Sequence, residues 1–188
     1  EANLSVDYIR GLRTTMEHNT VLGTPPDVLA KIKEYDIILN VNTPYLDWTS
    51  VLVKDYGEVL RPYAMPVKTW INEGIRVTFE AAGTDFWKPI HTLITRKITN
   101  PITKEIETML PGQAIDRVTA LKMTTTWASE YILAEDTLGT LESGKYADFV
   151  VLDEDFFTIP VEDIPGVQVI MTGLAGEIVY DRDQLAGR

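Results

Sequence analysis

Three residues at the ends of expected strands could do chemistry. His18, Asn42 and Asp85 each follow a short apolar run of strand character. In folds built from parallel strands, side chains at the carboxyl ends point into the loops of the open face, where function gathers. A neutral imidazole there can bind a divalent metal, and a carboxylate can ligate the metal and accept a proton from bound water.

Each of these residues also has a purely structural explanation. Asp85 could cap a helix that begins at residue 86, which is a common role of aspartate. His18 could be a hydrogen-bonded histidine of a core or a loop. For His91, the only other histidine, we prefer the structural explanation, because it lies on an expected helix two residues after Pro89.

Further residues near these strand ends could bind substrate. Glu80, in the sequence FEAAGTD, could contact substrate or orient a ligand, with a salt bridge as the equal alternative. Tyr45 and Trp87 lie in expected loops over strand ends, which supply the walls of substrate pockets, although each could equally be packing. With Asn42, these residues form the expected substrate-binding set.

The hydrophobic pattern of the first half of the chain predicts strands that alternate with helices. Expected strands cover residues 14–22, 36–42 and 75–79, and expected helices cover residues 27–35 and 66–73. Residues 42–66 are expected to form a long irregular loop, of a length usually found in lids or binding loops. This order of elements favours parallel βα units over an all-β sandwich.

The second half is expected to begin with helices and to end in strands. Helical spacing covers residues 87–98 and residues 113–133, the latter as one or two helices. Beyond residue 138 the pattern becomes β-like, and Gly173 and Gly176 bracket an expected hairpin turn. Residues 135–188 hold 12 acidic and 3 basic residues, against 16 and 14 before them. This shift predicts a change of domain near residue 135.

The composition excludes several classes of protein. The 188 residues are 45% hydrophobic and 24% charged, which is typical of a chain that folds around a core, and the absence of cysteine excludes disulfides and thiolate metal sites. A net charge of −11 opposes binding to nucleic acid or to an anionic membrane surface. No apolar run approaches the length of a membrane span. Because the start lacks both methionine and a signal-peptide pattern, we expect the true N-terminus to be missing.

A specific motif lies near the end of the chain. Residues 139–153, GTLESGKYADFVVLD, resemble the closing signature of the amidohydrolase superfamily, G-x-[IL]-x-x-G-K-x-A-D-[LFI]-[VL]-V-[LF]-D. Residues 169–180 also match the strand–turn–strand pattern that follows it. Together with MEHN at 16–19 and AAGTDFW at 81–87, the resemblance covers essentially the whole chain. It is most similar to the third amidohydrolase subfamily, whose members are metal-dependent hydrolases of amides and related bonds.

The resemblance implies an α/β fold, the C-terminal part of a (β/α)8 TIM barrel that begins near the sixth strand. It makes His18 the sixth-strand histidine and Asp85 the eighth-strand aspartate, so we prefer metal ligation by both and a catalytic role for Asp85. The family's H-x-H motif, bridging Lys or Glu and fifth-strand histidine have no counterpart here. We expect residues 1–134 to form the barrel part and residues 135–188 a small β-rich appendage of the β-sandwich type, in which Lys145 fixes a turn.

The leading hypothesis is a hydrolase of an amide or other C–N bond in a small-molecule substrate. By resemblance it uses a divalent metal, zinc, whose missing ligands come from an N-terminal portion or a second chain. The alternative is a non-catalytic fragment or partner subunit that completes a barrel. We expect additional polypeptide, either such a portion or a homo-oligomer, because a half barrel exposes apolar sheet edges. The cytoplasm is the favoured location.

Overall fold

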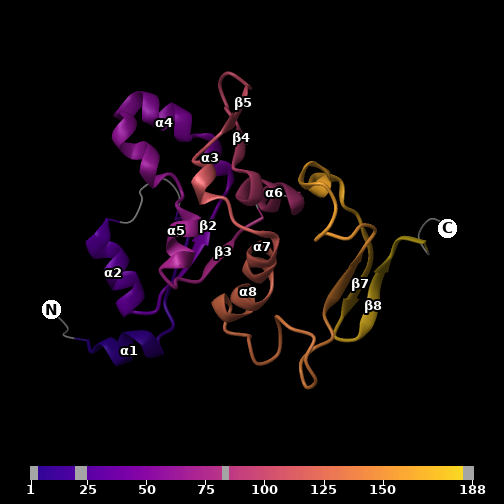
Figure 1. Cartoon of the computed structure of the whole chain (residues 1–188). Helices are drawn as coiled ribbons and strands as arrows, with labels where there is room; N and C mark the ends of the chain where they lie inside the picture. Colours follow the sequence, from indigo (N-terminus) through magenta and orange to yellow (C-terminus); the bar gives the residue numbers. More distant parts are fainter. Residues whose placement is uncertain (1–3, 20–24, 82–84, 184–188) are drawn as a thin grey trace.

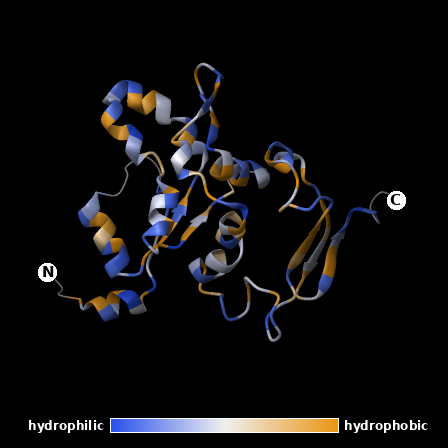
Figure 2. Cartoon of the chain, viewed as in Figure 1, coloured by the Kyte–Doolittle hydropathy of each residue, from blue (hydrophilic) through white to orange (hydrophobic). Residues whose placement is uncertain are grey.

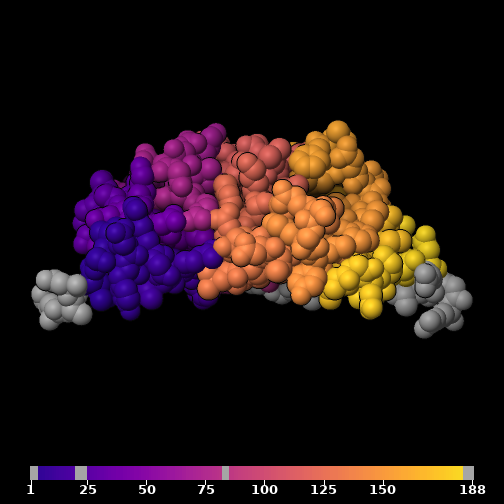
Figure 3. Space-filling view, turned by 90° about the horizontal axis from the view of Figure 1, so that it is seen from below, coloured from indigo at the N-terminus to yellow at the C-terminus, as the bar shows by residue number. Residues whose placement is uncertain are grey.

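The computed structural model describes residues 4–19, 25–81 and 85–183, which form a mixed α/β molecule. The chain advances from one end of the molecule to the other, as the order of colours in Figure 3 shows. Among the described residues, no helix is both long enough and apolar enough to cross a bilayer.

A three-stranded parallel sheet organises the first half of the chain. Its strands are β1 (Thr15–Met16), β2 (Ile38–Val41) and β3 (Val77–Phe79), in the order β1-β2-β3. All four residues of β2 are buried, as expected of a central strand that is covered on both faces. The three predicted strands are therefore present, although β1 is much shorter than the predicted run of residues 14–22.

Helices connect and cover these strands (Figure 1). Helix α1 (Val6–Gly11) is capped by the Ser5 hydroxyl, and α2 (Pro26–Glu34) begins with proline in its first turn, where the missing N–H costs nothing. Helix α5 (Val67–Asn72) leads into β3. Ile32 of α2 and Trp70 of α5 are buried in the same apolar core as Leu39 of β2.

The prediction of a long irregular loop over residues 42–66 was wrong. This segment folds into α3 (Pro44–Asp47), α4 (Thr49–Tyr56) and the 3-10 helix η1 (Glu58–Tyr63). Leu46 and Val53 are buried and anchor α3 and α4 to the core side. The many exposed aromatic residues between and around them hid this helical spacing in the sequence.

The segment after β3 departs from the prediction at one point. Helix α6 (Trp87–Thr95) ends at Arg96, whose left-handed backbone (φ 59°) stops the helix, so that residues 97–98 are not helical. They begin instead an unpredicted antiparallel pair, β4 (Lys97–Thr99) with β5 (Ile106–Thr108). After the 3-10 helix η2 (Pro111–Gln113), the two predicted helices follow as α7 (Arg117–Thr124) and α8 (Thr126–Tyr131).

Arg96 is itself a fully buried cation. Its guanidinium donates hydrogen bonds to the carbonyl oxygens of Met109 (3.0 Å), Met65 (3.3 Å) and Ala64 (3.0 Å). Burial lowers the pKa of Arg96 to about 10. The residue therefore ties the end of α6 to two chain segments that are distant in sequence.

The C-terminal part is β-rich, as predicted. Strands β6 (Phe149–Leu152), β7 (Val169–Leu174) and β8 (Glu177–Asp181) form an antiparallel sheet, preceded at β7 by the 3-10 helix η3 (Val161–Gly166). The predicted hairpin turn lies at Ala175 and Gly176, both with positive φ. The described residues of this part contain one three-stranded sheet, so a β-sandwich is not confirmed. Figure 2 shows hydrophobic residues along these strands.

The signature motif of residues 139–153 makes structural contacts. The Lys145 ammonium donates to the carbonyl oxygens of Glu135 (2.6 Å) and Leu138 (3.3 Å), and so fixes the turn before the sheet. The Asp148 carboxylate accepts a hydrogen bond from the Ala175 backbone in the β7–β8 turn (2.7 Å). Gly139 (φ 90°) lies so close to Ser129 that no side chain fits there.

The apolar core is continuous across residue 135. Phe156 and Ile164, which belong to the β-rich part, are buried in the same cluster as Ile90 and Leu93 of α6. The division into domains at residues 134 and 135 therefore stays a prediction.

Candidate functional site

The carboxyl ends of the three parallel strands bring together three polar side chains. His18 lies two residues beyond β1, Asn42 directly follows β2, and Glu80 directly follows β3. His18 Nε2 lies 2.9 Å from Glu80 Oε2, and the Asn42 amide donates a hydrogen bond to Glu80 Oε1. One carboxylate thus joins all three strand ends.

The local sequence turns His18 toward this carboxylate. His18 has a left-handed backbone (φ 55°), which ends the regular alternation of side chains along β1. The Asn19 side-chain amide holds the turn by donating to the carbonyl oxygens of Met16 (2.7 Å) and Asn40 (3.1 Å). The sequence His-Asn therefore supplies both the functional ring and the residue that fixes its backbone.

A buried polar layer lies one step lower on the same sheet. Asn40 and Thr78 are partners in the β2–β3 register, and the Asn40 amide donates to the Thr78 hydroxyl (3.0 Å). Asn42 and Glu80 follow two residues later on the same face, because side chains alternate along a strand. The Oδ1 atoms of Asn40 and Asn42 are both buried without a hydrogen-bond partner.

Tyr45 also belongs to this group. It lies in α3, just beyond Asn42, and its ring centroid is 5.8 Å from that of His18 at an interplanar angle of 51°. The side chain is 43% exposed, so it can contact a molecule that approaches His18 from solvent. The structure therefore brings together four of the predicted residues: His18, Asn42, Tyr45 and Glu80.

Asp85 and Trp87 lie in other surroundings. Asp85 Oδ1 accepts a hydrogen bond from the Lys88 backbone (3.0 Å), so Asp85 does cap the start of α6, the alternative considered from the sequence. Residues 82–84, which precede it in the family motif, lie outside the described residues. The Trp87 ring packs against Phe86 and Phe156, beside an apolar pocket of about 540 Å³.

Sequence reasoning missed one carboxylate near Asp85. Asp47 lines a cavity of about 340 Å³ together with Asp85 and Lys88. Burial raises the pKa of Asp47, although the hydrogen bond from the Thr99 backbone (3.2 Å) and the nearby Lys88 ammonium oppose this shift. Its signal in the sequence was its position five residues after Asn42, in the segment that was expected to be a loop.

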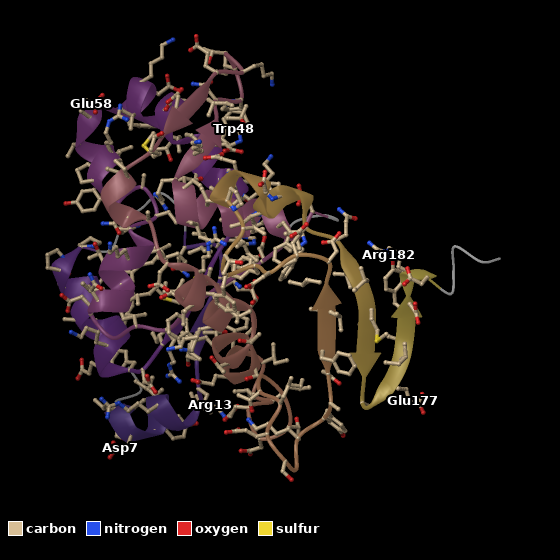
Figure 4. The ribbon with its side chains drawn as sticks, turned by 45° about the vertical axis from the view of Figure 1, so that its right-hand side comes forward. Asp7, Arg13, Trp48, Glu58, Glu177 and Arg182 are labelled. Carbon is tan, nitrogen blue, oxygen red and sulfur yellow. The ribbon has the colours of Figure 1, made fainter. Side chains whose placement is uncertain are left out.

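The opposite ends of the strands carry ion pairs. Arg13, before β1, pairs with Glu135 (2.6 Å), and Arg76, before β3, pairs with Asp36 (2.6 Å) and Glu130. Figure 4 shows Arg13 and Trp48 at opposite ends of this part of the molecule. Matched charge pairs at the amino ends favour stability, which leaves the carboxyl ends as the candidate functional face.

The comparisons with known proteins agree with the sequence motif. Residues 5–180 match the family model described as the amidohydrolase family. The chain belongs to the amidohydrolase family. No curated protein matches the sequence significantly.

Solved structures extend this assignment to the amidohydrolase fold. An uncharacterized metal-dependent hydrolase from Pyrococcus furiosus is 23% identical, with a TM-score of 0.62 over 81% of this chain and 32% of its own. A mutant atrazine chlorohydrolase from Arthrobacter aurescens TC1, complexed with zinc and atraton, is 18% identical (TM-score 0.57; 90% and 36%). An adenosine deaminase from Xanthomonas campestris with bound zinc is 16% identical (0.62; 92% and 38%). This amidohydrolase chain spans about a third of their lengths, and the likeness shows part of the amidohydrolase TIM-barrel fold.

The described part of this amidohydrolase does not fit a complete metal centre. Among the described residues, no three His, Cys, Asp or Glu side chains converge as a metal site requires. The polar cluster contains a single imidazole, His18, and one of its ring nitrogens is already engaged by Glu80. Structural zinc sites have four ligands and catalytic ones usually three from protein, so ligands are missing.

Proposed function

We propose that this chain is the C-terminal portion of a hydrolase that cleaves an amide or another C–N bond of a small-molecule substrate. The observation that carries the proposal is the amidohydrolase family match over residues 5–180. That match favours a hydrolase over a non-catalytic partner subunit. The polar cluster at the carboxyl ends of the parallel strands supports the same conclusion, since this is the face on which barrel enzymes carry their sites.

The proposal gives each predicted residue a role. Asp85 is the catalytic carboxylate that takes a proton; its Oδ1 caps α6, which leaves Oδ2 for this task. His18 contacts a metal or the substrate. Asn42, Tyr45 and Glu80 surround His18 and bind substrate, with Tyr45 as the exposed wall of the site. Trp87 has a weaker claim, because its ring packs against Phe156.

A divalent metal, with zinc as the first candidate, belongs to this proposal. His18 and Asp85 would be two of its ligands, and the bound metal would supply an activated water. Because the described residues do not complete such a site, the proposal places the other ligands in polypeptide outside this sequence. The zinc in the neighbouring structures supports the choice of metal.

The sheet supports the need for further polypeptide. Within the described residues, β1 and β3 each pair with β2 alone, so each has an open edge. Open edges of this kind accept further strands. An N-terminal portion of the same protein, or a second chain, would pair there and continue the barrel.

Replacing Asp85 by alanine in the longer protein that contains this sequence tests the proposal. Release of ammonia or amine from a panel of amides and N-acylated amino acids identifies a substrate for the unmodified protein. We expect Asp85→Ala to lower turnover of that substrate by about 10²-fold or more, as for other positioned acid–base groups. Asp55→Ala, an exposed aspartate of α4, is the matched control. Full activity of Asp85→Ala with retained fold would refute the assignment.

A further inference from the structure

The carboxylate of Glu80 has two hydrogen-bond partners, and they differ in freedom. As a carboxylate, Glu80 offers only acceptors. The Asn42 amide fills Oε1 as a donor, and His18 Nε2, at 2.9 Å, faces Oε2. An acceptor facing Oε2 would be repelled, so the ring nitrogen at this position must carry the proton.

The other ring nitrogen of His18 is left with a free lone pair. A neutral imidazole has one N–H and one acceptor nitrogen, and the partner of the first decides the identity of the second. Among the described residues, Nδ1 of His18 makes no hydrogen bond. The neighbouring Asn19 amide, the nearest donor in sequence, is committed to the carbonyl oxygens of Met16 and Asn40.

We propose that Glu80 is a positioning residue that fixes His18 in the Nε2–H tautomer, so that Nδ1 is the atom presented to a metal ion or substrate. The inference rests on the proposed function for the purpose of Nδ1, and it deepens that function. A carboxylate that holds the second nitrogen of a working histidine is a general way to fix both ring orientation and tautomer.

The fold holds Glu80 firmly enough for this role. Its backbone N–H donates to the carbonyl oxygen of Val41 (3.0 Å), which extends the β2–β3 pairing by one residue. Asn42 fixes the head of the side chain from the neighbouring strand. Glu80 is thus held at both ends, while His18 stays half exposed on the solvent side.

The chain has only two histidines, which makes the test direct. Nitrogen-15 NMR of the 188-residue chain, with labelled histidine rings and at a pH where both rings are neutral, reports which nitrogen of each ring carries the proton. The His91→Gln variant assigns the two signals. We expect His18 to be protonated at Nε2 and bare at Nδ1; the opposite tautomer in the unmodified chain overturns the proposal, whatever the variants do.

The Glu80→Ala variant tests the cause of the tautomer. We expect the ratio of the Nε2–H to the Nδ1–H form of His18 to fall about tenfold or more, the equivalent of one hydrogen bond to a charged group. An unchanged ratio in a folded variant would show that Glu80 does not select the tautomer. Glu162→Ala is the matched control, because Glu162 lies 3.6 Å from His91 Nε2 and should leave His18 unaffected.

The outcome is separable from that of the proposed function. The tautomer is read without substrate and without turnover, so an inactive chain can still confirm or overturn the role of Glu80. Conversely, a hydrolase that works with Asp85 replaced would contradict the proposed function while leaving the tautomer as measured. Thermal unfolding of each variant shows whether it retains the native fold.

Discussion

Replacing Arg96 by methionine should destabilise the fold substantially, although the change removes a charge from the interior. Arg96 is fully buried, and its guanidinium donates to three backbone carbonyl oxygens. The Met65 carbonyl keeps a second hydrogen bond, from the Val67 backbone (2.8 Å). The carbonyls of Ala64 and Met109 receive no other hydrogen bond from the described residues.

The magnitude follows from these two carbonyls. An unsatisfied buried acceptor costs about 1–3 kcal/mol, so two cost about 2–6 kcal/mol. Methionine no longer has to be desolvated as a cation, which returns part of this loss. We therefore expect the free energy of unfolding to fall by about 3 kcal/mol, measured by urea denaturation followed by circular dichroism. A loss below about 1 kcal/mol would contradict the assigned role.

Alkaline pH and a surface arginine provide two checks. Burial lowers the pKa of Arg96 to about 10 in the folded state, against an ordinary value of 12.5, so the unfolded chain binds more protons between these values. The stability of the unmodified protein relative to Arg96→Met should therefore rise as the pH increases through about 10. A flat difference would contradict this. Arg182→Met, at an exposed arginine, should change stability by less than about 0.5 kcal/mol.

Two further substitutions test the packing of the sheet and a helix cap. Gly173→Ala would place a methyl group 2.3 Å from the Phe149 ring, so thermal unfolding should show a loss of about 1–3 kcal/mol, whereas Gly166→Ala, with open space around it, should be nearly neutral. Asp116→Ala removes the cap of α7, in which the carboxylate accepts from the Thr119 backbone (2.7 Å), and should cost about 1 kcal/mol at pH 7. Because this hydrogen bond lowers the pKa of Asp116, its contribution is complete above the unfolded pKa near 3.8 and disappears as the pH falls through the lower folded value; an equal effect at pH 2 would argue against the cap.

Much of the parallel sheet was predictable because its signals are local. The apolar run of residues 36–42 and the amphipathic spacing before it correspond to β2 and α2. The meeting of His18 and Asn42 was predictable as well, since the carboxyl ends of neighbouring parallel strands share one edge. The helices of residues 44–63 were missed because exposed aromatic residues masked two buried positions seven residues apart.

The pairing within the candidate site was not predictable from pattern alone. Contact between His18 and Glu80 depends on a left-handed backbone at a histidine, which propensity does not indicate, and on a carboxylate two strands away. Asp85 illustrates the converse: its motif suggested a site residue, and its visible contact is a helix cap. Residue type narrowed the candidates, and tertiary geometry chose between their partners.

The contacts of the signature motif change how the motif should be used. Lys145 and Asp148 bind backbone groups of nearby turns, and Arg117 of α7 donates to the carbonyl oxygens of Phe156 and Ile159. The β-rich segment is thereby braced against the helices around the sheet. A chain that keeps this motif has kept the brace, which selection can preserve after catalysis is lost. Surveys that seek working enzymes in this family should therefore rank sequences by the residues at the three strand ends.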